Sequence, residues 1–130
     1  MNISEKDWKL FRKKVPQWQE AYMDRLASEY IAILSGSENS SEKFWNLYDR
    51  INADVNCVGV QIRMSRSRMI QNIISLINEG AITLDDLSDF SDELRENVQD
   101  FIAANEAYKE YIANPQQSRA FNESKEELKL

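Results

Sequence analysis

Histidine is absent from this chain of 130 residues, and cysteine occurs once, at Cys57. The absence of histidine removes the usual general base, the Ser–His and Cys–His catalytic pairs and most zinc sites. A single cysteine cannot form an internal disulfide, which is typical of the reducing cytoplasm. Because Cys57 lies among apolar residues, we expect a buried, unreactive thiol. We therefore predict a cytoplasmic protein that is not an enzyme and uses no metal or cofactor.

Long apolar runs are also missing. The longest segment without a charge or a helix breaker lies between Met69 and Glu79. A transmembrane helix needs ~18 to 20 apolar residues, so we expect no membrane span. Residues 1–5 are polar and charges follow at once, which is unlike a signal peptide.

Glycine and proline are scarce and fall between the apolar segments, at Gly36, Gly59, Gly80, Pro16 and Pro115. Such residues are typical of helix ends and turns. Proline lacks an N–H and disfavours helical geometry at the residue before it. We therefore expect one helix to end near Val15 and a second to begin at Pro16.

Apolar residues recur at helical spacing along most of the chain. The fold class predicted from this pattern is all-α, a compact bundle of five to six helices with no significant sheet. Residues 1–113 should form a single helical domain. Residues 114–130 are polar and should form a flexible C-terminal tail. The expected helices cover approximately residues 4–15, 16–35, 41–55, 67–78, 83–88 and 91–114.

Short polar residues mark the starts of these helices. Ser4 and Ser91 are good N-caps, and Ser40 or Ser41 is expected to cap the helix between them. Thr83 and Asp86 have the spacing of a capping box around a short helix. Residues 57–64 alternate in polarity like a strand, but a lone strand has no partner, so we expect an extended connector in the core.

Charge is unevenly distributed. The chain has 16 basic and 22 acidic residues, a net charge of −6. Residues 80–113 alone carry nine acidic and two basic side chains. This region predicts an interaction face for a partner of opposite charge, unless it is simply solvated or pairs with basic residues of the same chain. The candidate residues of this acidic face are Asp85, Asp86, Asp89, Asp92, Glu93 and Glu96.

Three arginines crowd the expected start of a helix at residues 63–68. Cations are disfavoured there by the helix dipole, by roughly 0.3 to 1 kcal/mol each. Free N–H groups, hydroxyls and guanidinium groups together favour a phosphate or carboxylate site. The alternative is that the arginines pair with Asp85, Asp86, Asp89 or Asp92 and join two helices. The candidate anion site, the arginine cluster, comprises Arg63, Ser65, Arg66, Ser67 and Arg68.

Two further patterns bear on partners. Residues 73–101 resemble a helix-turn-helix array, but the helix starting at Ser91 exposes mostly acids, so we do not expect direct nucleic-acid binding. Aromatic residues lie at helical spacing, which favours core packing and leaves an exposed peptide groove as the alternative. These aromatic residues are Trp8, Trp18, Tyr22, Tyr30, Trp45 and Tyr48.

Several stretches resemble a group of small uncharacterised helical proteins of Gram-positive anaerobic bacteria. The similar stretches are Phe44–Trp45, Arg63–Ser67 and the segment from Gly80 to Leu94, within a resemblance over roughly residues 4–102. Similar sequences sometimes carry a multidrug-transporter label, which this sequence does not support because no segment can span a bilayer. The resemblance implies a complete small protein and supplies no catalytic residue.

The function predicted from the sequence is a non-enzymatic protein-interaction module acting through the acidic face (85–100) and the arginine cluster (63–68). We expect a protein partner or a homo-oligomer. One alternative is a regulator that binds a small anion or phosphate ligand at the arginine cluster. Another is an acidic inhibitor from a phage or mobile element that acts on a nucleic-acid enzyme.

Overall fold

The computed structural model describes residues 2–113, so the predicted flexible tail at 114–130 lies outside the described residues. Two units make up the chain, Met1–Arg95 and Glu96–Leu130. The described residues contain four α-helices and two short 3₁₀ segments, with no strand. The helices are α1 (Glu5–Leu34), α2 (Ser40–Asp54), α3 (Met69–Asn78) and α4 (Asp92–Ala113), and the 3₁₀ segments are η1 (Arg66–Arg68) and η2 (Leu84–Leu87).

The all-α class is confirmed, but the prediction of five to six helices is wrong because Pro16 does not divide the first helix. α1 is 30 residues long in all and continues without a break through Pro16. Pro16 lies on the exposed side of α1, where water can reach the carbonyl that its missing N–H leaves free. Phe11 and Val15 before it and Tyr22 after it are buried, so packing on both sides holds the helix together.

The second difference is the predicted short helix at residues 83–88. Only a 3₁₀ segment, η2, forms there. The capping box of Thr83 and Asp86 is present as predicted, with the Thr83 N–H donating to Asp86 Oδ2 at 2.7 Å. Only four residues lie between the N-cap Thr83 and the C-cap Ser88. A segment this short is too short for an α-helix to propagate, and it closes as a 3₁₀ turn.

The helix starts and stops follow the sequence closely. Ser4 caps α1 by accepting from the Asp7 N–H at 3.1 Å. α2 is capped by Asn39, which accepts from the Glu42 N–H, and not by Ser40 or Ser41, which already belong to the helix. Gly80 ends α3 with a positive φ of 77°, and the Ala81 N–H then returns to the Leu76 carbonyl at 2.8 Å.

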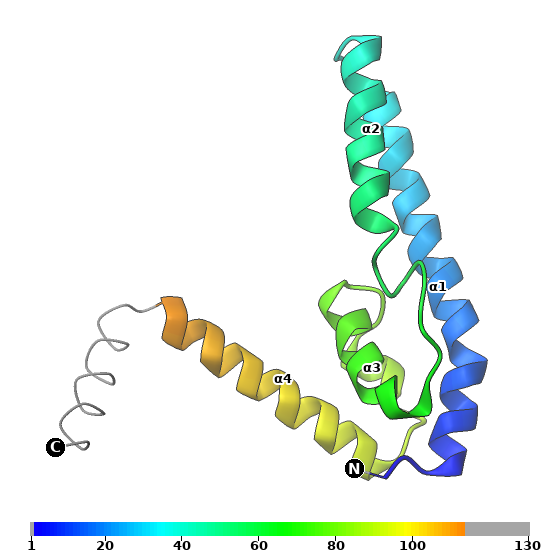
Figure 1. The fold of residues 1–130 in the computed structure, drawn as a ribbon, viewed down its shortest axis with the longest axis vertical. Helices are drawn as coiled ribbons and strands as arrows, with labels where there is room; N and C mark the ends of the chain where they lie inside the picture. The colour runs from blue at the N-terminus through cyan, green and yellow to red at the C-terminus, as the bar shows by residue number, and fades with distance from the viewer. Residues whose placement is uncertain (1, 114–130) are drawn as a thin grey trace, which may run out of the picture. The chain divides into compact units, whose positions relative to one another are not determined.

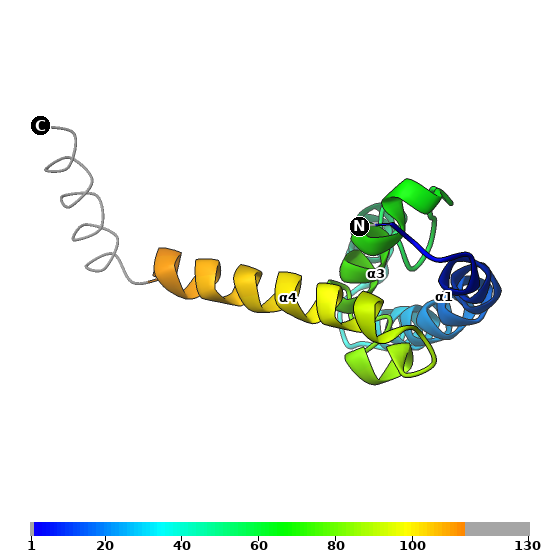
Figure 2. The same cartoon turned by 90° about the horizontal axis from the view of Figure 1, so that it is seen from below.

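α1 and α2 lie side by side as a helical hairpin, which Figure 1 shows at the end away from α3. α3 lies beside the first half of α1 in both Figure 1 and Figure 2. The connector and turns around α3 contact this half of α1, since Gln19 donates to the Val58 carbonyl at 3.1 Å and Lys14 pairs with Asp89 at 3.1 Å. The core of the first unit therefore lies between α3 and the first half of α1, and the hairpin extends beyond it.

α3 is the most apolar helix and supplies much of this core, as the sequence predicts. Met69, Ile73 and Leu76 are fully buried. Residues 57–64 form the expected irregular connector, with Gly59 buried against the ring of Tyr22. No helix among residues 2–113 is long and apolar enough to cross a membrane.

Candidate functional site

The arginine cluster does not form the pairs that the sequence analysis weighed against an anion site. Arg66 pairs with Glu5 at 2.8 Å and also donates to the Ile3 carbonyl, which ties η1 to the start of α1. None of its contacts is to Asp85, Asp86, Asp89 or Asp92. Arg66 is therefore a structural residue of the N-terminal end of the first unit.

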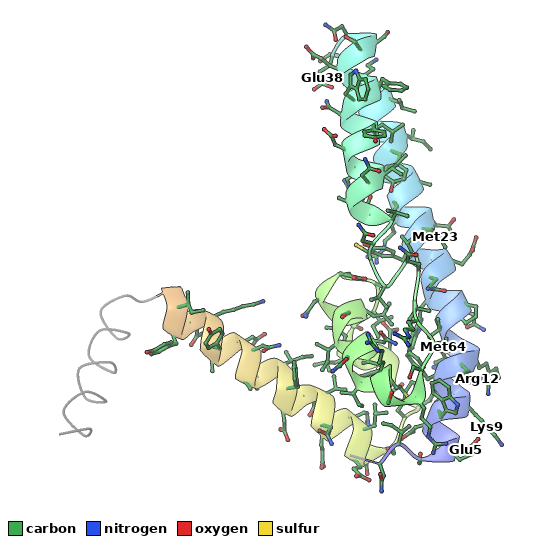
Figure 3. The ribbon with its side chains drawn as sticks, viewed as in Figure 1. Glu5, Lys9, Arg12, Met23, Glu38 and Met64 are labelled. Carbon is green, nitrogen blue, oxygen red and sulfur yellow. The ribbon has the colours of Figure 1, made fainter. Side chains whose placement is uncertain are left out.

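Arg63 and Arg68 have exposed side chains, and among residues 2–113 neither makes an ion pair. Arg63 contributes its backbone carbonyl, which accepts from Asn72 Nδ2 at 3.1 Å. The hydroxyls of Ser65 and Ser67 hydrogen-bond to each other at 3.0 Å. Figure 3 shows the exposed Met64 of this segment beside the first half of α1. Two of the three predicted arginines thus keep free guanidinium groups.

Half of the predicted acidic face is engaged by other groups of the same chain. Asp86 belongs to the capping box, Asp89 pairs with Lys14, and Asp92 pairs with Arg95 one turn later. Asp85 and Glu93 are exposed in the first turns of η2 and α4. Glu96 is the first residue of the second unit. Much of this negative charge therefore stabilises turns and helix starts.

The aromatic residues separate into two groups, and the core prediction is wrong for one of them. Phe11 and Trp18 contact at 6.3 Å between ring centroids, and Trp18 contacts Phe90 at 6.3 Å, as expected of core residues. In α2, however, Trp45 is 58% exposed, and its exposed neighbours Phe44 and Tyr48 contact only its edges. The exposed aromatic groove, which was the alternative, describes this second group.

One side of the α1–α2 hairpin carries two parallel apolar stripes. Each stripe repeats at i, i+4, i+7 and i+11, which places its four residues on one helix face. Both stripes open to the same side, because residues of both line a single groove of about 260 Å³ between the helices. This surface, here called the hairpin face, comprises Met23, Ala27, Tyr30 and Leu34 of α1, Phe44, Tyr48 and Ile51 of α2, and Val55, the C-cap of α2.

The hairpin face contains no charged residue and is large for a protein surface. Apart from the tyrosines and the alanine, it has five large apolar residues, all of which are exposed, and Phe44 is 61% exposed. With the adjacent Trp45 the exposed apolar area is on the order of 500 Å², given the usual surface of aromatic and aliphatic side chains. Contiguous patches of that size commonly mark interaction sites.

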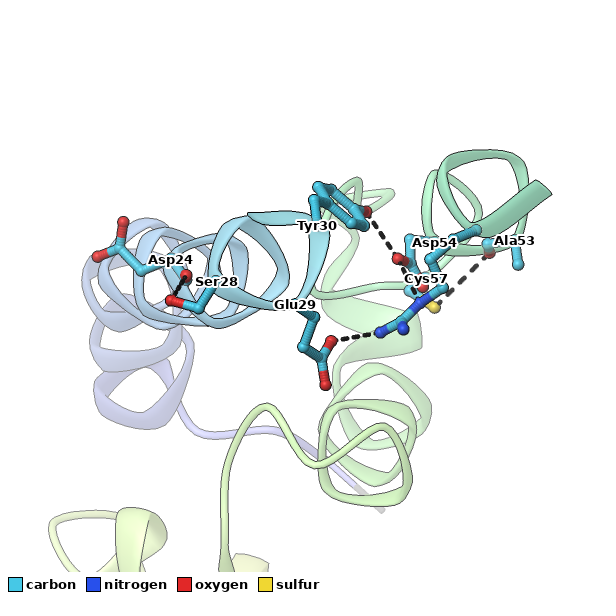
Figure 4. Close-up of polar contacts among 8 residues, drawn as sticks. Asp24, Ser28, Glu29, Tyr30, Ala53, Asp54 and Cys57 are labelled. Atoms are coloured by element: carbon cyan, nitrogen blue, oxygen red, sulfur yellow. Dashed lines mark hydrogen bonds and ion pairs between the residues drawn. The ribbon is translucent and has the colours of Figure 1, made fainter. Parts of the chain in front are cut away.

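A buried polar cluster fixes the groove of the hairpin face. Asp54, only 8% exposed, accepts from the Tyr30 hydroxyl at 2.6 Å and from Arg50 Nε at 2.9 Å (Figure 4). Arg50 also pairs with Glu29 of α1, and the neighbouring carboxylates raise its pKa. Burial, with the hydrogen bond to Asp54, raises the pKa of Tyr30 to about 12. These contacts join α1 to α2 and hold the groove in one shape.

The charges around the hairpin are mostly negative. Residues 20–55 hold seven acidic and three basic side chains. Of the bases, Arg50 is paired, Arg25 donates to the Gly80 carbonyl and lies over the ring of Tyr22, and the half-buried Lys43 makes no ion pair among the described residues. Five exposed acids have no ion pair among the described residues: Glu20, Asp24, Glu38, Glu42 and Asp49.

Other chemistry finds little support in residues 2–113. No group of three His, Cys, Asp or Glu side chains there could hold a metal ion. Cys57 is half-buried rather than fully buried, with its thiol near the Ala53 carbonyl. A polar crevice beside the hairpin is lined by Arg25, Glu29, Arg50 and Glu79, and all four side chains are engaged by protein groups.

No family model, curated protein or solved structure matches this chain. The resemblance to small bacterial helical proteins therefore stays a prediction. The hairpin face itself could have been noticed in the sequence, because Phe44, Tyr48, Ile51 and Val55 recur at helical spacing. That spacing indicates a helix face that needs a cover, and it does not say whether the same chain supplies the cover.

Proposed function

We propose that this protein is a protein-interaction module and that the hairpin face is its main binding surface. The observation that carries the proposal is the pair of charge-free apolar stripes on one side of α1 and α2, both open to a common groove. Helical proteins commonly bind helices of their partners in such grooves. This moves the proposed surface from the acidic face and the arginine cluster to the hairpin.

The physical basis is that polar contacts join α1 to α2, whereas the apolar hairpin face is left uncovered among the described residues. The inner side is held by Tyr30, Arg50 and Asp54, so the groove exists before a partner arrives. A preformed groove reduces the ordering cost of association. The exposed aromatic side chains Phe44, Trp45 and Tyr48 are of the type that contributes most to binding energy.

The proposal is tested by photo-crosslinking in the full chain. A benzophenone amino acid replaces Tyr48 on the hairpin face or, as the control, Asn46 on the opposite side of α2. A partner that crosslinks to position 48 and not to position 46, and that is lost with Ile51→Lys, supports the proposal. Equal crosslinking from both positions, or crosslinking that Ile51→Lys leaves unchanged, contradicts it.

A second candidate function rests on Arg63 and Arg68. Their exposed guanidinium groups lack ion pairs among the described residues, next to the hydroxyls of Ser65 and Ser67. This favours a contact with a small anion or a phosphate group, without Arg66. The acidic-inhibitor alternative has fewer free carboxylates than the sequence indicates, since Asp86, Asp89 and Asp92 are engaged by other groups of the chain.

A further inference from the structure

We infer that the partner of the hairpin face is an amphipathic helix with basic flanks, an inference that rests on the proposed function. The groove lies between α1 and α2, with apolar walls from Met23, Ala27, Ile51 and Val55 and a contribution from Val60 of the connector. A third helix is the element that fits this shape, because its own stripe at i, i+4 and i+7 would pack between the two stripes of the hairpin face.

The flanks of the partner follow from the charges of the hairpin. Glu20 and Asp24 lie one step around α1 from the stripe that begins at Met23, and both are exposed. Glu38 lies in the loop at the tip of the hairpin, whereas Glu42 and Asp49 share the opposite side of α2 with Asn46. A helix in the groove therefore meets the unpaired carboxylates of Glu20 and Asp24 beside its apolar stripe, and lysine or arginine at the facing positions is complementary.

A second copy of the chain fits this surface less well. It would bring a second Glu20 and Asp24 to the same surface, since two copies related by a two-fold axis use the same patch. The basic side chains of the hairpin offset little of this, because Arg25 and Arg50 are already engaged within their own chain and only Lys43, of the three, has no ion pair among the described residues. Charge thus distinguishes a basic helix from a homodimer.

The test uses the full chain and three synthetic helical peptides of about 15 residues, the length of α2. All three carry the same leucine stripe at i, i+4, i+7 and i+11, and they differ only in lysine, glutamine or glutamate at the flanking positions. Dissociation constants are measured by calorimetry at about 0.05 M and 0.5 M salt, where screening differs strongly.

We expect the lysine peptide to bind at least about tenfold more tightly than the glutamate peptide, with the glutamine peptide between them, and the difference to shrink at high salt. Ile51→Lys should weaken all three, and the matched Asn46→Lys should not. The paired change Glu20→Gln and Asp24→Asn should reduce the preference for lysine and leave the glutamine peptide unaffected. Tyr48→Gln provides a second face variant that adds no charge.

Other results overturn the inference in distinguishable ways. Equal binding of the three peptides, or a preference for glutamate, contradicts the basic partner and leaves the proposed function standing. A dimer that is seen in sedimentation and that Ile51→Lys abolishes would also contradict the basic partner and leave the proposed function standing. A second copy of the chain would then be the occupant of the hairpin face. Binding of none of the peptides by a monomer contradicts both proposals. Hydroxyl-radical labelling of Trp45 and Tyr48 then shows whether the chain covers the face itself.

Discussion

The carboxylate of Asp7 accepts two hydrogen bonds from Ser91, a residue 84 positions later in the chain. The Ser91 N–H lies 3.0 Å from Asp7 Oδ1, and the Ser91 hydroxyl lies 2.6 Å from Asp7 Oδ2. The same hydroxyl accepts from the Leu94 N–H at 3.2 Å, so it also caps the start of α4. Asp7 thus directs the hydroxyl proton of Ser91 toward α1 and leaves its lone pairs for the helix.

Replacing Asp7 with alanine should destabilise the protein strongly. Asp7 is 2% exposed, and its loss removes the acceptor of two hydrogen bonds from Ser91. Hydrogen bonds to charged groups contribute about 1.5–3 kcal/mol each, so we expect the free energy of unfolding to fall by about 2–4 kcal/mol. Urea denaturation measures the change.

The matched variant is Ser91→Ala, which removes the hydroxyl and keeps the N–H contact. It should cost about 1–2 kcal/mol, typical of a lost N-cap. Because both residues belong to one network, the double variant should cost less than the two single changes added together. Additive costs would show that Asp7 and Ser91 act independently.

Gly59 is required for the approach of the connector to α1. A Cβ atom at this position would overlap the ring of Tyr22, which is itself buried. The backbone of the connector is held in place here, since the N–H groups of Val58 and Gly59 donate to the Glu79 carboxylate at 2.9 and 3.0 Å. We expect Gly59→Ala to lower the free energy of unfolding by about 1–3 kcal/mol, as overpacking does.

Gly36 offers the control for this substitution. A Cβ there would meet no atom closer than 3.4 Å, so Gly36→Ala should change stability by less than about 0.5 kcal/mol. Thermal melts of the two variants side by side provide the comparison. Similar losses for both would rule out the close contact with Tyr22 as the cause.

The pKa of Tyr30 predicts a loss of stability at alkaline pH. Burial and the hydrogen bond to Asp54 raise this pKa from 10.0 to about 12, so the folded protein holds the phenolic proton more tightly than the unfolded chain. The resulting stabilisation is fully present below pH 10 and is lost as pH rises toward 12. Tyr30→Phe removes this contribution. The stability difference between the two proteins should therefore be largest below pH 10 and shrink toward pH 12.

Denaturation midpoints measured across this pH range test the prediction. Tyr22, whose pKa burial and the contact with Cys57 also raise to about 12, is present in both proteins and cancels in the difference. A difference that stays constant with pH would mean that Tyr30 is not held by Asp54.

Local signals in the sequence were enough to predict most of the helices. The caps at Ser4 and Ser91, the stop at Gly80 and the apolar run of α3 depend on neighbours a few residues away, and the structure confirms them. The helix count was wrong because Pro16 was judged by its local cost alone. The burial of Phe11 and Tyr22 by distant residues outweighs that cost.

The candidate surface was harder to predict, because exposure depends on which elements cover one another. The stripe from Phe44 to Val55 has the same pattern as a core helix, and only the arrangement of α1 and α2 leaves it open. In the same way, the sequence indicates Ser91 only as a local N-cap, and no local pattern links it to Asp7, 84 positions earlier.

Pro16 gives a direct test of the balance between local preference and packing. Proline in a helix interior destabilises the helix by about 3 kcal/mol relative to alanine. Replacing proline with alanine also raises the conformational entropy of the unfolded chain, which offsets part of the gain. Since Pro16 is exposed within α1, Pro16→Ala should raise the free energy of unfolding by roughly 1–3 kcal/mol. The neighbouring exposed change Gln17→Ala should have little effect. A loss of stability in Pro16→Ala would show that the proline is favourable in its place.

Arg63 and Arg68 predict a response to small anions. If their free guanidinium groups bind phosphate or sulfate, these anions should raise the melting temperature above its value in chloride of equal ionic strength. The rise should vanish in the double variant Arg63→Ala with Arg68→Ala. It should persist in the control pair Arg12→Ala with Lys13→Ala, which removes equal charge from exposed positions of α1. Nucleotides extend the series to larger phosphate ligands. If no anion shifts the melting of the unmutated protein, Arg63 and Arg68 are solvated surface charges and the hairpin face remains the only proposed binding surface.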